Sequence, residues 1–372
     1  MKKLLFIFGT RPEAIKLAPL ILKAKQTGTY QVKVCVTAQH REMLDQVLSF
    51  FGVEVDFDLN LMWPNQSLFD ITSKALIALG KVLSKDTPDL IFVQGDTTTA
   101  FVGALAGYYK KIKVAHIEAG LRSGNKFSPY PEEINRILVG HLGDYHFTPT
   151  IRAEKNLSNE GIVNNVWTVG NTVIDALYMC LDIIKKEREQ KYYNYFDFVD
   201  FSKKIVLVTG HRRESFGKPF ENICYALKAL GETFKGSEIV YPVHLNPNVR
   251  QPVNRILKST KNVHLIEPLE YPYLVWLMNR AHFVLTDSGG IQEEAPTLGK
   301  PVLVMRDITE RLEGIEAGTA KIVGTQKENI LKQASTLLTN RREYERMAKV
   351  TNPYGDGKAA GRILKILRRE IH

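Results

Sequence analysis

The sequence predicts an α/β protein built from two successive doubly wound halves, each a parallel β-sheet with helices on both sides. Short apolar runs of four to six residues alternate with longer amphipathic segments, and this alternation starts a second time near the middle of the chain. The length of 372 residues also exceeds the usual size of one domain. We therefore expect a ligand in the cleft between the carboxyl ends of the two sets of strands.

In the first half, six β-rich runs are apolar almost throughout, as is typical of strands buried on both faces. The segments between them have helical periodicity, and βαβ repetition of this kind predicts a parallel sheet. The predicted strands are residues 4–8, 32–36, 90–94, 114–117, 145–148 and 166–169. The predicted helices are residues 12–25, 42–51, 68–83, 98–109 and 132–141.

The second half begins after a helical stretch that starts near Thr172. Residues 191–198 break both periods and predict the approach to a second domain. The pattern then resumes with predicted strands at residues 205–209, 239–243, 263–266, 283–286 and 301–305.

The predicted domains are residues 1–170 and residues 171–357. In the last predicted helix, residues 358–369, Ile363, Ile366 and Leu367 share one stripe. We expect the C-terminal segment 358–372 to pack back on the first domain.

The composition, with 44% hydrophobic and 24% charged residues, is that of an ordinary globular chain and argues against disorder. No stretch approaches the roughly 20 apolar residues of a spanning helix, so we expect no membrane partner. Cys35, Cys180 and Cys224 are far apart, which fits neither a disulfide framework nor a metal site and suits the cytoplasm.

The formal net charge of +10 would suit nucleic acid, an anionic membrane or an anionic small molecule. No basic tail or nucleic-acid-binding motif accompanies it, so we expect no nucleic-acid partner. The positive excess lies mainly in residues 1–50 and 201–250, at the start of each half. This placement predicts two separate anion-facing loops.

The first of these loops follows the strand at residues 4–8. Thr10 and Glu13 have the spacing of a capping box, which is a sufficient structural explanation for both. Arg11 and Lys16 are also near this helix N-terminus, where the helix dipole disfavours positive charges. The capping box does not explain these two cations, but an anion bound at the helix start would.

The other two loops follow strands of the second half. His211 and Arg212 stand directly after the strand at residues 205–209, and arginine forks suit phosphate oxygens. Gly289 and Gly290 let backbone N–H groups approach an oxyanion, while Ser288 would cap the helix in a purely structural reading. Further along this third loop, Glu294 is placed to accept hydrogen bonds from sugar hydroxyls.

Three carboxylates follow strands of the first half: Asp96, Glu118 and Glu132. Each has a structural alternative, since Asp96 could cap the next helix and Glu132 could favour a helix N-terminus. Together they suit proton transfer beside an anionic leaving group. His116 is expected to be a satisfied core histidine, and no HExxH, clustered Cys/His or GxSxG element is present.

Seven segments resemble one family across essentially the whole chain, namely the bacterial non-hydrolysing UDP-N-acetylglucosamine 2-epimerases. They are residues 8–16, 37–41, 95–99, 118–122, 210–214, 287–296 and 352–357. The resemblance implies two Rossmann-like domains in the glycosyltransferase-B arrangement, a homodimer and no metal or cofactor. It also implies interconversion of UDP-GlcNAc and UDP-ManNAc through 2-acetamidoglucal, for bacterial surface polysaccharide.

The resemblance further implies residue roles. Asp96, Glu118 and Glu132 match the catalytic carboxylates without deciding which removes the C2 proton, and His211 joins them as a catalytic residue. The matching substrate or UDP ligands are Arg11, Lys16, Asp96, Glu118, His211, Ser288, Gly289, Gly290, Glu294 and Arg311.

A second UDP-GlcNAc acts as an activator in bacterial members. Gln39, Arg212 and His244 match that set in this sequence. Glu42 is expected at the same site, although Glu42 and Asn65 stand where some relatives carry Gln and Arg. Leu312 likewise follows Arg311 where Pro is common. A hydrolysing epimerase that releases ManNAc and UDP, a transferase of the same architecture and a nucleotide-sugar sensor are the alternative functions.

Overall fold

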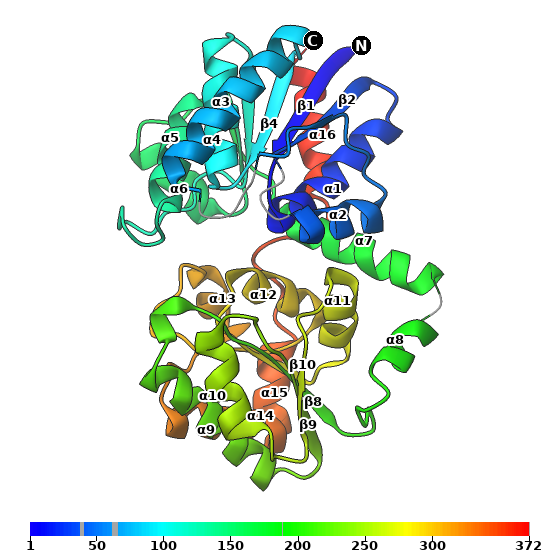
Figure 1. Cartoon of the computed structure of the whole chain (residues 1–372), viewed down its shortest axis with the longest axis vertical. Coiled ribbons are helices and arrows are strands. Elements are labelled where there is room, and N and C mark those ends of the chain that lie inside the picture. Colours follow the sequence, from blue (N-terminus) through cyan, green and yellow to red (C-terminus); the bar gives the residue numbers. More distant parts are fainter. Residues whose placement is uncertain (38–40, 62–65, 188, 372) are drawn as a thin grey trace. The chain divides into compact units, whose positions relative to one another are not determined.

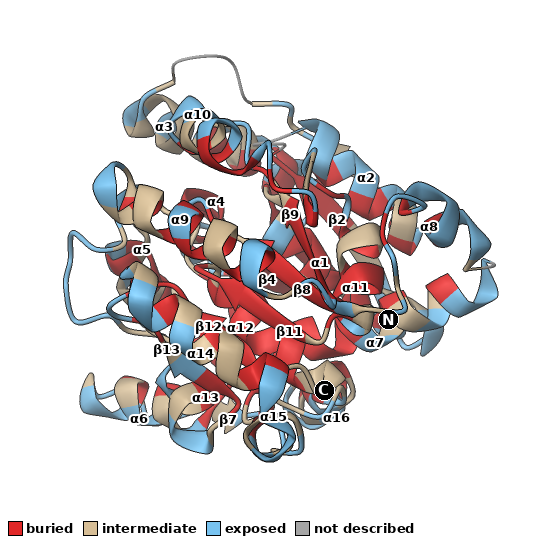
Figure 2. Cartoon of the chain, turned by 90° about the horizontal axis from the view of Figure 1, so that it is seen from below, coloured by how far each residue is buried: buried red, intermediate tan, exposed pale blue. Residues whose placement is uncertain are grey.

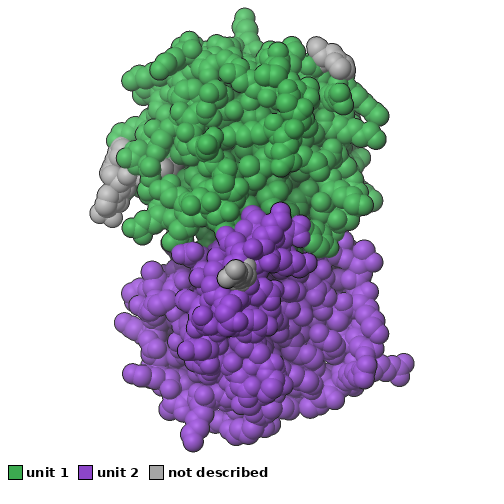
Figure 3. All heavy atoms as spheres, turned by 90° about the vertical axis from the view of Figure 1, so that its right-hand side faces the viewer, with its two compact units in different colours: residues 1–179, 355–372 green, residues 180–354 purple. Residues whose placement is uncertain are grey.

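The chain folds into two compact units (Figure 3). The computed structural model describes residues 1–37, 41–61, 66–187 and 189–371. Unit 1 comprises residues 1–179 and 355–372, and unit 2 comprises residues 180–354. The predicted boundary after residue 170 lies just before helix α7, in which unit 1 ends.

The predicted α/β class is confirmed, because each unit is a parallel sheet flanked by helices (Figure 1). Over the described residues, the seven strands of unit 1 have the order β3-β2-β1-β4-β5-β6-β7. They are β1 Lys2–Phe8, β2 Tyr30–Val36, β3 Phe57–Asp58, β4 Leu90–Gln94, β5 Lys113–Ile117, β6 Tyr145–Thr148 and β7 Val166–Thr168. All six predicted strands are present, and β3 was missed because two residues carry no periodic signal.

Unit 2 repeats this design with six strands among its described residues, in the order β10-β9-β8-β11-β12-β13. They are β8 Lys204–Thr209, β9 Ser237–Pro242, β10 Val263–Ile266, β11 Phe283–Thr286, β12 Val302–Val304 and β13 Ala320–Ile322. The five predicted strands are confirmed, and the short edge strand β13 is additional.

The α-helices of unit 1 cover both faces of its sheet. They are α1 Arg11–Gln26, α2 Arg41–Phe51, α3 Leu68–Lys85, α4 Thr98–Tyr109, α5 Glu132–Leu142, α6 Ile151–Asn159, α7 Thr172–Lys186 and, from the C-terminus, α16 Ala359–Glu370. In unit 2 the α-helices and the 3-10 helices (η) are α8 Gln190–Tyr195, η1 Arg213–Ser215, α9 Lys218–Thr233, α10 Pro247–Leu257, α11 Tyr271–Arg280, α12 Gly289–Glu294, η2 Ala295–Leu298, α13 Leu312–Ala317, α14 Lys327–Thr339 and α15 Arg341–Ala348.

The strands form the cores of the two units, as their apolar runs predict (Figure 2). Leu4 to Phe8 in β1 are at most 1% exposed, and Val206 to Val208 in β8 are fully buried. Removing this apolar area from water is the main stabilising contribution to each unit. The loops after the strands are thereby held at one edge of a rigid sheet.

The segment 191–198 differs from its prediction, because part of it forms α8 within unit 2. Its aromatic rings pack on Trp276 of α11, with the Phe196 ring stacked at 5.4 Å and the Tyr192 ring at 5.8 Å between centroids. This tertiary packing stabilises a helix that the local sequence pattern does not predict.

Helix α16 packs against α1 in unit 1. Ile363 and Leu367 are fully buried and Leu364 is 7% exposed, whereas Ile366 is only half-buried. The apolar stripe therefore runs through Leu364 rather than Ile366, so that detail of the prediction was wrong. Asp175 of α7 accepts hydrogen bonds from the N–H groups of Ala359 and Ala360 and fixes the start of α16.

The strand order of each sheet reverses at one point, between β1 and β4 in unit 1 and between β8 and β11 in unit 2. In open parallel sheets, ligands bind outside the carboxyl ends of the strands at such a reversal. Arg11 and Asp96 follow β1 and β4, and His211 and Asp287 follow β8 and β11. Topology thus points to the loops that the sequence singled out.

Candidate active site in two units

A buried carboxylate joins the two loops at the reversal point of unit 1. Oε2 of Glu13 accepts hydrogen bonds from the N–H of Thr10 at 2.8 Å and of Gly9 at 3.1 Å, which confirms the capping box. Oε1 accepts the hydroxyl of Thr97 at 2.7 Å, from the loop after β4. Burial raises the pKa of Glu13, and these hydrogen bonds partly oppose that effect. A Cβ on Gly9 would lie 2.1 Å from Oγ1 of Thr37, so the close approach here requires glycine.

Glu118 and Lys16 form a charge pair at the carboxyl edge of the same sheet. Nζ of Lys16 lies 2.6 Å from each carboxylate oxygen of Glu118. Their side chains are only 12% and 5% exposed, so water screens the pair weakly. Gln94 and Asn171 also donate to Glu118, Asn171 at 3.2 Å. The backbone of Glu118 has φ of +63°, a costly conformation for a residue other than glycine that often accompanies functional positions.

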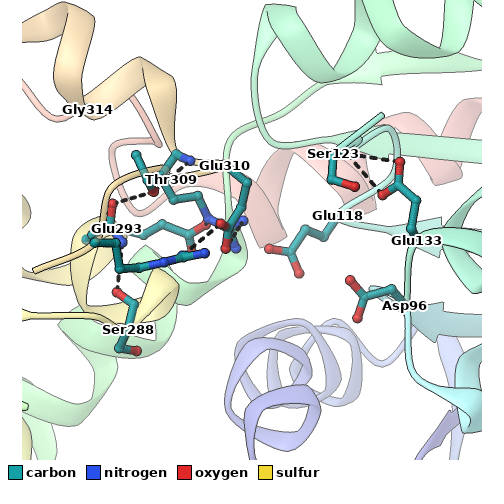
Figure 4. A network of polar contacts seen from close by, with 12 residues as sticks. Asp96, Glu118, Ser123, Glu133, Ser288, Glu293, Thr309, Glu310 and Gly314 are labelled. Carbon is teal, nitrogen blue, oxygen red and sulfur yellow. Dashed lines mark hydrogen bonds and ion pairs between the residues drawn. The ribbon is translucent and has the colours of Figure 1, made fainter. Parts of the chain in front are cut away.

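Two residues of α5 hold Asp96 in place. Its carboxylate pairs with the buried guanidinium of Arg136, and its backbone oxygen accepts from Nδ2 of Asn135 at 2.9 Å. The alternative that Asp96 caps the next helix is wrong, since Thr97 caps α4 through a 3.0 Å hydrogen bond from the N–H of Ala100. In Figure 4 the Asp96 and Glu118 carboxylates extend into the same space beyond the strand ends.

Two adjacent glutamates begin α5, and the structure separates their roles. Glu133 is buried and accepts from the N–H groups of Ser123 and Gly124 at 2.9 to 3.0 Å, and from Arg136 at 3.1 Å (Figure 4). Oε2 of Glu132 is also buried, but it has no hydrogen-bond partner among the described residues. Buried carboxylate oxygens are rarely left without partners, so Glu132 has bonding capacity free for another molecule.

His116 is a core histidine, as expected, but only one of its ring nitrogens is satisfied. It is fully buried, and Nε2 lies 2.8 Å from the backbone oxygen of Gly95. Nδ1 has no hydrogen-bond partner among the described residues. Burial lowers its pKa to about 3. The ring is therefore neutral at physiological pH and supports the loop before Asp96.

In unit 2, His211 leaves the end of β8 beside Asp287. The buried carboxylate of Asp287 accepts from the N–H of His211 at 2.7 Å and of Arg212 at 2.8 Å. The ring of His244 stacks on the ring of His211 with centroids 5.3 Å apart. Burial and then the neighbouring His211 lower the pKa of His244.

Three arginines surround the carboxylate of Glu310. The distances from its carboxylate oxygens to the guanidinium nitrogens are 2.9 Å for Nη1 of Arg306, 3.6 Å for Nη1 of Arg311 and 3.9 Å for Nη2 of Arg212. Burial alone would raise the pKa of Glu310, but the arginine charges outweigh it and hold the pKa at about 2. Arg311 also pairs with Glu293 at 2.6 Å, so its guanidinium is held between two carboxylates.

The loop after β11 opens the short helix α12. Ser288 occupies the N-cap position, yet its hydroxyl makes no capping hydrogen bond. A Cβ on Gly289 would lie 3.2 Å from Glu310, so this backbone lies close to the arginine cluster. The buried Glu294 accepts the hydroxyl of Tyr271 at 2.7 Å.

The 352–357 segment holds this arrangement together. Nδ2 of Asn352 donates to the backbone oxygen of Glu293 at 2.8 Å, and the hydroxyl of Tyr354 donates to that of Arg311 at 3.0 Å. The segment thus fixes the glutamate and the arginine that pair with each other.

The remaining predicted residues are placed as follows. Arg11 is the first residue of α1 and is half-buried. Glu42 is exposed in the first turn of α2. Gln39 and Asn65 lie outside the described residues.

Several residues at these two sheet edges were missed in the sequence: Gln94, Glu133, Arg136, Asn171, Tyr271, Asp287 and Arg306. Three had a usable signal, since Gln94 is a polar residue ending an apolar run and Asp287 and Arg306 directly follow predicted strands. Glu133 stands next to Glu132, and its partners lie within 10 residues. The other three, Arg136, Asn171 and Tyr271, are recognisable only by their contacts, because the partners lie 40, 53 and 23 residues away.

Within the described ranges, no group of three or more His, Cys, Asp or Glu side chains is placed to hold a metal ion. No described helix is both long enough and apolar enough to cross a bilayer.

Comparisons with known proteins show the family to which the chain belongs. Residues 22–368 match the family model described as UDP-N-acetylglucosamine 2-epimerase. The chain is 54% identical over 370 residues to UDP-N-acetylglucosamine 2-epimerase of Escherichia coli strain K12, covering 98% of each chain.

Solved structures are similar over the same length. The UDP-GlcNAc 2-epimerase from Neisseria meningitidis, bound to UDP-GlcNAc, is 49% identical with a TM-score of 0.94, covering 99% of this chain and 100% of that one. The enzyme from Methanocaldococcus jannaschii, in complex with UDP-GlcNAc and UDP, is 36% identical with a TM-score of 0.83, covering 99% of each chain. By sequence and by fold, the chain belongs to the UDP-N-acetylglucosamine 2-epimerase family.

Proposed function

We propose that the chain interconverts UDP-GlcNAc and UDP-ManNAc by elimination and re-addition of UDP, without net hydrolysis. The observation that carries the proposal is the division of chemistry between the two sheets. Asp96 lies at the reversal point of one sheet and Glu118 follows the neighbouring strand β5, while His211 lies at the reversal point of the other sheet, whose carboxyl edge also holds the arginines around Glu310. Proton transfer at carbon and stabilisation of a leaving diphosphate require these two sets of groups.

The steps balance without an oxidant or a reductant. A carboxylate removes the C2 proton as the bond between C1 and the UDP oxygen breaks, which gives 2-acetamidoglucal and UDP. UDP then adds back at C1 while a proton is delivered to the opposite face of C2. In this proposal Asp96, Glu118 and Glu132 carry the proton transfers.

The UDP side is assigned to a second set of residues. Arg11, Lys16, His211 and Arg311 stabilise the diphosphate charge with the N–H groups of residues 288–290. Glu294, in the helix that opens after β11, binds the ribose. The product would supply ManNAc units for bacterial surface polysaccharide.

An incubation with UDP-GlcNAc alone in heavy water tests this mechanism. We expect the product to be UDP-ManNAc that carries deuterium at C2. ¹H and ³¹P NMR would detect it. UDP-ManNAc without deuterium would exclude proton exchange at C2 and with it the proposed elimination.

The same reaction mixture separates the alternatives. Accumulation of free ManNAc with UDP would identify a hydrolysing epimerase. Turnover that requires an added acceptor would identify a transferase, and binding without turnover a sensor. We also expect the activity to survive exhaustive chelation, since no step uses a metal.

We also propose activation by a second UDP-GlcNAc at Gln39, Glu42, Arg212 and His244. Two contacts support it: His244 stacks on His211, and Arg212 shares Asp287 with His211. A ligand on Arg212 and His244 would therefore act directly on His211. We expect the rate to depend sigmoidally on the concentration of UDP-GlcNAc. In His244→Ala we expect this dependence to become hyperbolic.

The sequence also predicts a homodimer and a cytoplasmic location.

A further inference from the structure

The ends of β8 and β11 bring His211 and Asp287 together. The two strands are neighbours in parallel register, with Thr209 opposite Thr286. The N–H of Asp287 donates to the backbone oxygen of Thr209 at 3.2 Å. The residues that follow both strands therefore leave the sheet side by side.

The two oxygens of the Asp287 carboxylate have different surroundings. Oδ2 accepts the N–H groups of His211 and Arg212. Oδ1 has no hydrogen-bond partner among the described residues and lies 3.4 Å from Nδ1 of His211. Asp287 is 1% exposed, so its second oxygen needs a donor from the protein. At 3.4 Å, Nδ1 of His211 lies just beyond hydrogen-bonding distance of this oxygen and is the side-chain nitrogen recorded beside it.

His244 limits the ring of His211 on another side. The two rings stack with an interplanar angle of 13°, and Nδ1 of His244 accepts the N–H of Asn246 at 3.1 Å. The side chain of His211 is nevertheless 42% exposed. With one face stacked and Nδ1 directed at Asp287, Nε2 is the ring nitrogen left for another molecule.

We propose that Asp287 is a positioning residue for His211, which holds the proton on Nδ1 and presents Nε2 to the leaving diphosphate. The inference rests on the proposed role of His211 and deepens it. When the ring is protonated, Nε2–H donates to a diphosphate oxygen while the carboxylate of Asp287 balances the ring charge. A carboxylate that orients an imidazole in this way acts on catalysis without touching the substrate.

Four variants test this role by kinetics: Asp287→Asn, His211→Gln, the double variant and the control Asp175→Asn. In Asp287→Asn, the amide oxygen can serve the two backbone N–H groups, and the amide NH₂ then faces Nδ1 and forces the proton to Nε2. We expect kcat to fall about 10²-fold, the scale of one lost charge-stabilising donor, with little change in KM. In a His211→Gln background the same change should have little further effect.

Asp175 is a matched control because it is a buried carboxylate that accepts two backbone N–H groups and touches no histidine in the described contacts. We expect kcat per folded molecule to be unchanged in Asp175→Asn. Two outcomes would reduce Asp287 to a structural role. One is an equal loss of kcat in Asp175→Asn and Asp287→Asn. The other is that Asp287→Asn lowers kcat in the His211→Gln background as much as it does in the unsubstituted protein. Normal turnover in His211→Gln itself would instead overturn the proposed role of His211, and the inference with it.

A spectroscopic measurement on the unsubstituted protein does not depend on any variant folding. In ¹⁵N-histidine-labelled protein at alkaline pH, the neutral ring of His211 should show a protonated Nδ1 and an unprotonated Nε2, with the resonance assigned by its loss in His211→Gln. A neutral ring protonated on Nε2 would overturn the inference, whether or not the chain epimerises UDP-GlcNAc.

Discussion

Glu118 shows how backbone geometry and a charge pair together fix one carboxylate. Its backbone has φ of +63°, and Nζ of Lys16 lies 2.6 Å from its carboxylate and balances the negative charge. Burying this pair is costly by itself, because desolvation of two charges offsets much of their attraction. A positioned, weakly screened carboxylate is therefore better explained by chemistry than by stability.

Replacing Glu118 by Gln keeps the shape of the side chain and removes its charge and basicity. We expect turnover to fall about 10² to 10⁴-fold, the range of general acid–base catalysis, while UDP binding measured by calorimetry persists. Glu238→Gln is the matched control, since Glu238 is 6% exposed and also lies 2.6 Å from a lysine, Lys203. Near-normal turnover in Glu118→Gln would remove Glu118 from the mechanism.

The buried His116 makes the stability of the protein depend on pH. An unfolded chain binds a proton at this histidine below the ordinary pKa of 6.5, whereas the folded chain does so only near its lowered pKa of about 3. The free energy of unfolding must therefore decrease as pH falls from about 6.5 towards 3. At about 1.4 kcal/mol for each pKa unit, the contribution is of the order of several kcal/mol.

Urea unfolding at a series of pH values checks this. We expect His116→Gln to flatten the decrease between about pH 6.5 and 4, and His141→Gln to leave it unchanged because His141 is exposed. Parallel curves for the unsubstituted protein and His116→Gln would show that another group causes the acid sensitivity.

Among the elements, α5 has two functions at its N-terminus. Glu133 and Arg136 form hydrogen bonds and ion pairs within the protein, to the loop at residues 123–124 and to Asp96. Glu132, one residue earlier, has an unpartnered oxygen among the described residues. Adjacent positions in the first turn of α5 thus hold a candidate catalytic carboxylate and a structural one.

Two substitutions in α5 should give opposite patterns. In Glu133→Gln we expect faster amide exchange at Ser123 and Gly124 and a loss of about 1 to 3 kcal/mol of unfolding free energy, because buried charged hydrogen bonds are broken. In Glu132→Gln we expect unchanged exchange at these amides and severely reduced turnover. Equally faster exchange in both variants would contradict this division of roles.

At the scale of the whole molecule, the chain ends in the unit where it began. Helix α16 completes the core of unit 1 through Ile363 and Leu367, although residues 180–354 form unit 2. The stability of unit 1 therefore depends on a helix that follows unit 2 in the sequence.

Leu367→Ala tests this dependence. We expect a loss of about 2 to 5 kcal/mol, the usual cost of a buried leucine truncated to alanine. Hydrogen exchange followed by mass spectrometry should show the lost protection in unit 1, with the exposed Lys365→Ala as a control near zero. Lost protection confined to unit 2 would contradict the packing of α16 on unit 1.

The sequence by itself determined the α/β class, eleven strand positions, the capping box at Glu13 and the loops that carry Arg11, Asp96, Glu118 and His211. These are local signals, since apolar runs, helical periodicity and capping spacings are complete within a few residues. Only the tertiary structure decided the strand order, the helix at α8 and the pairing of Asp96 with Arg136 and of His211 with Asp287. Those partners lie 40 and 76 residues apart, so contacts formed on folding, rather than any local pattern, bring them together.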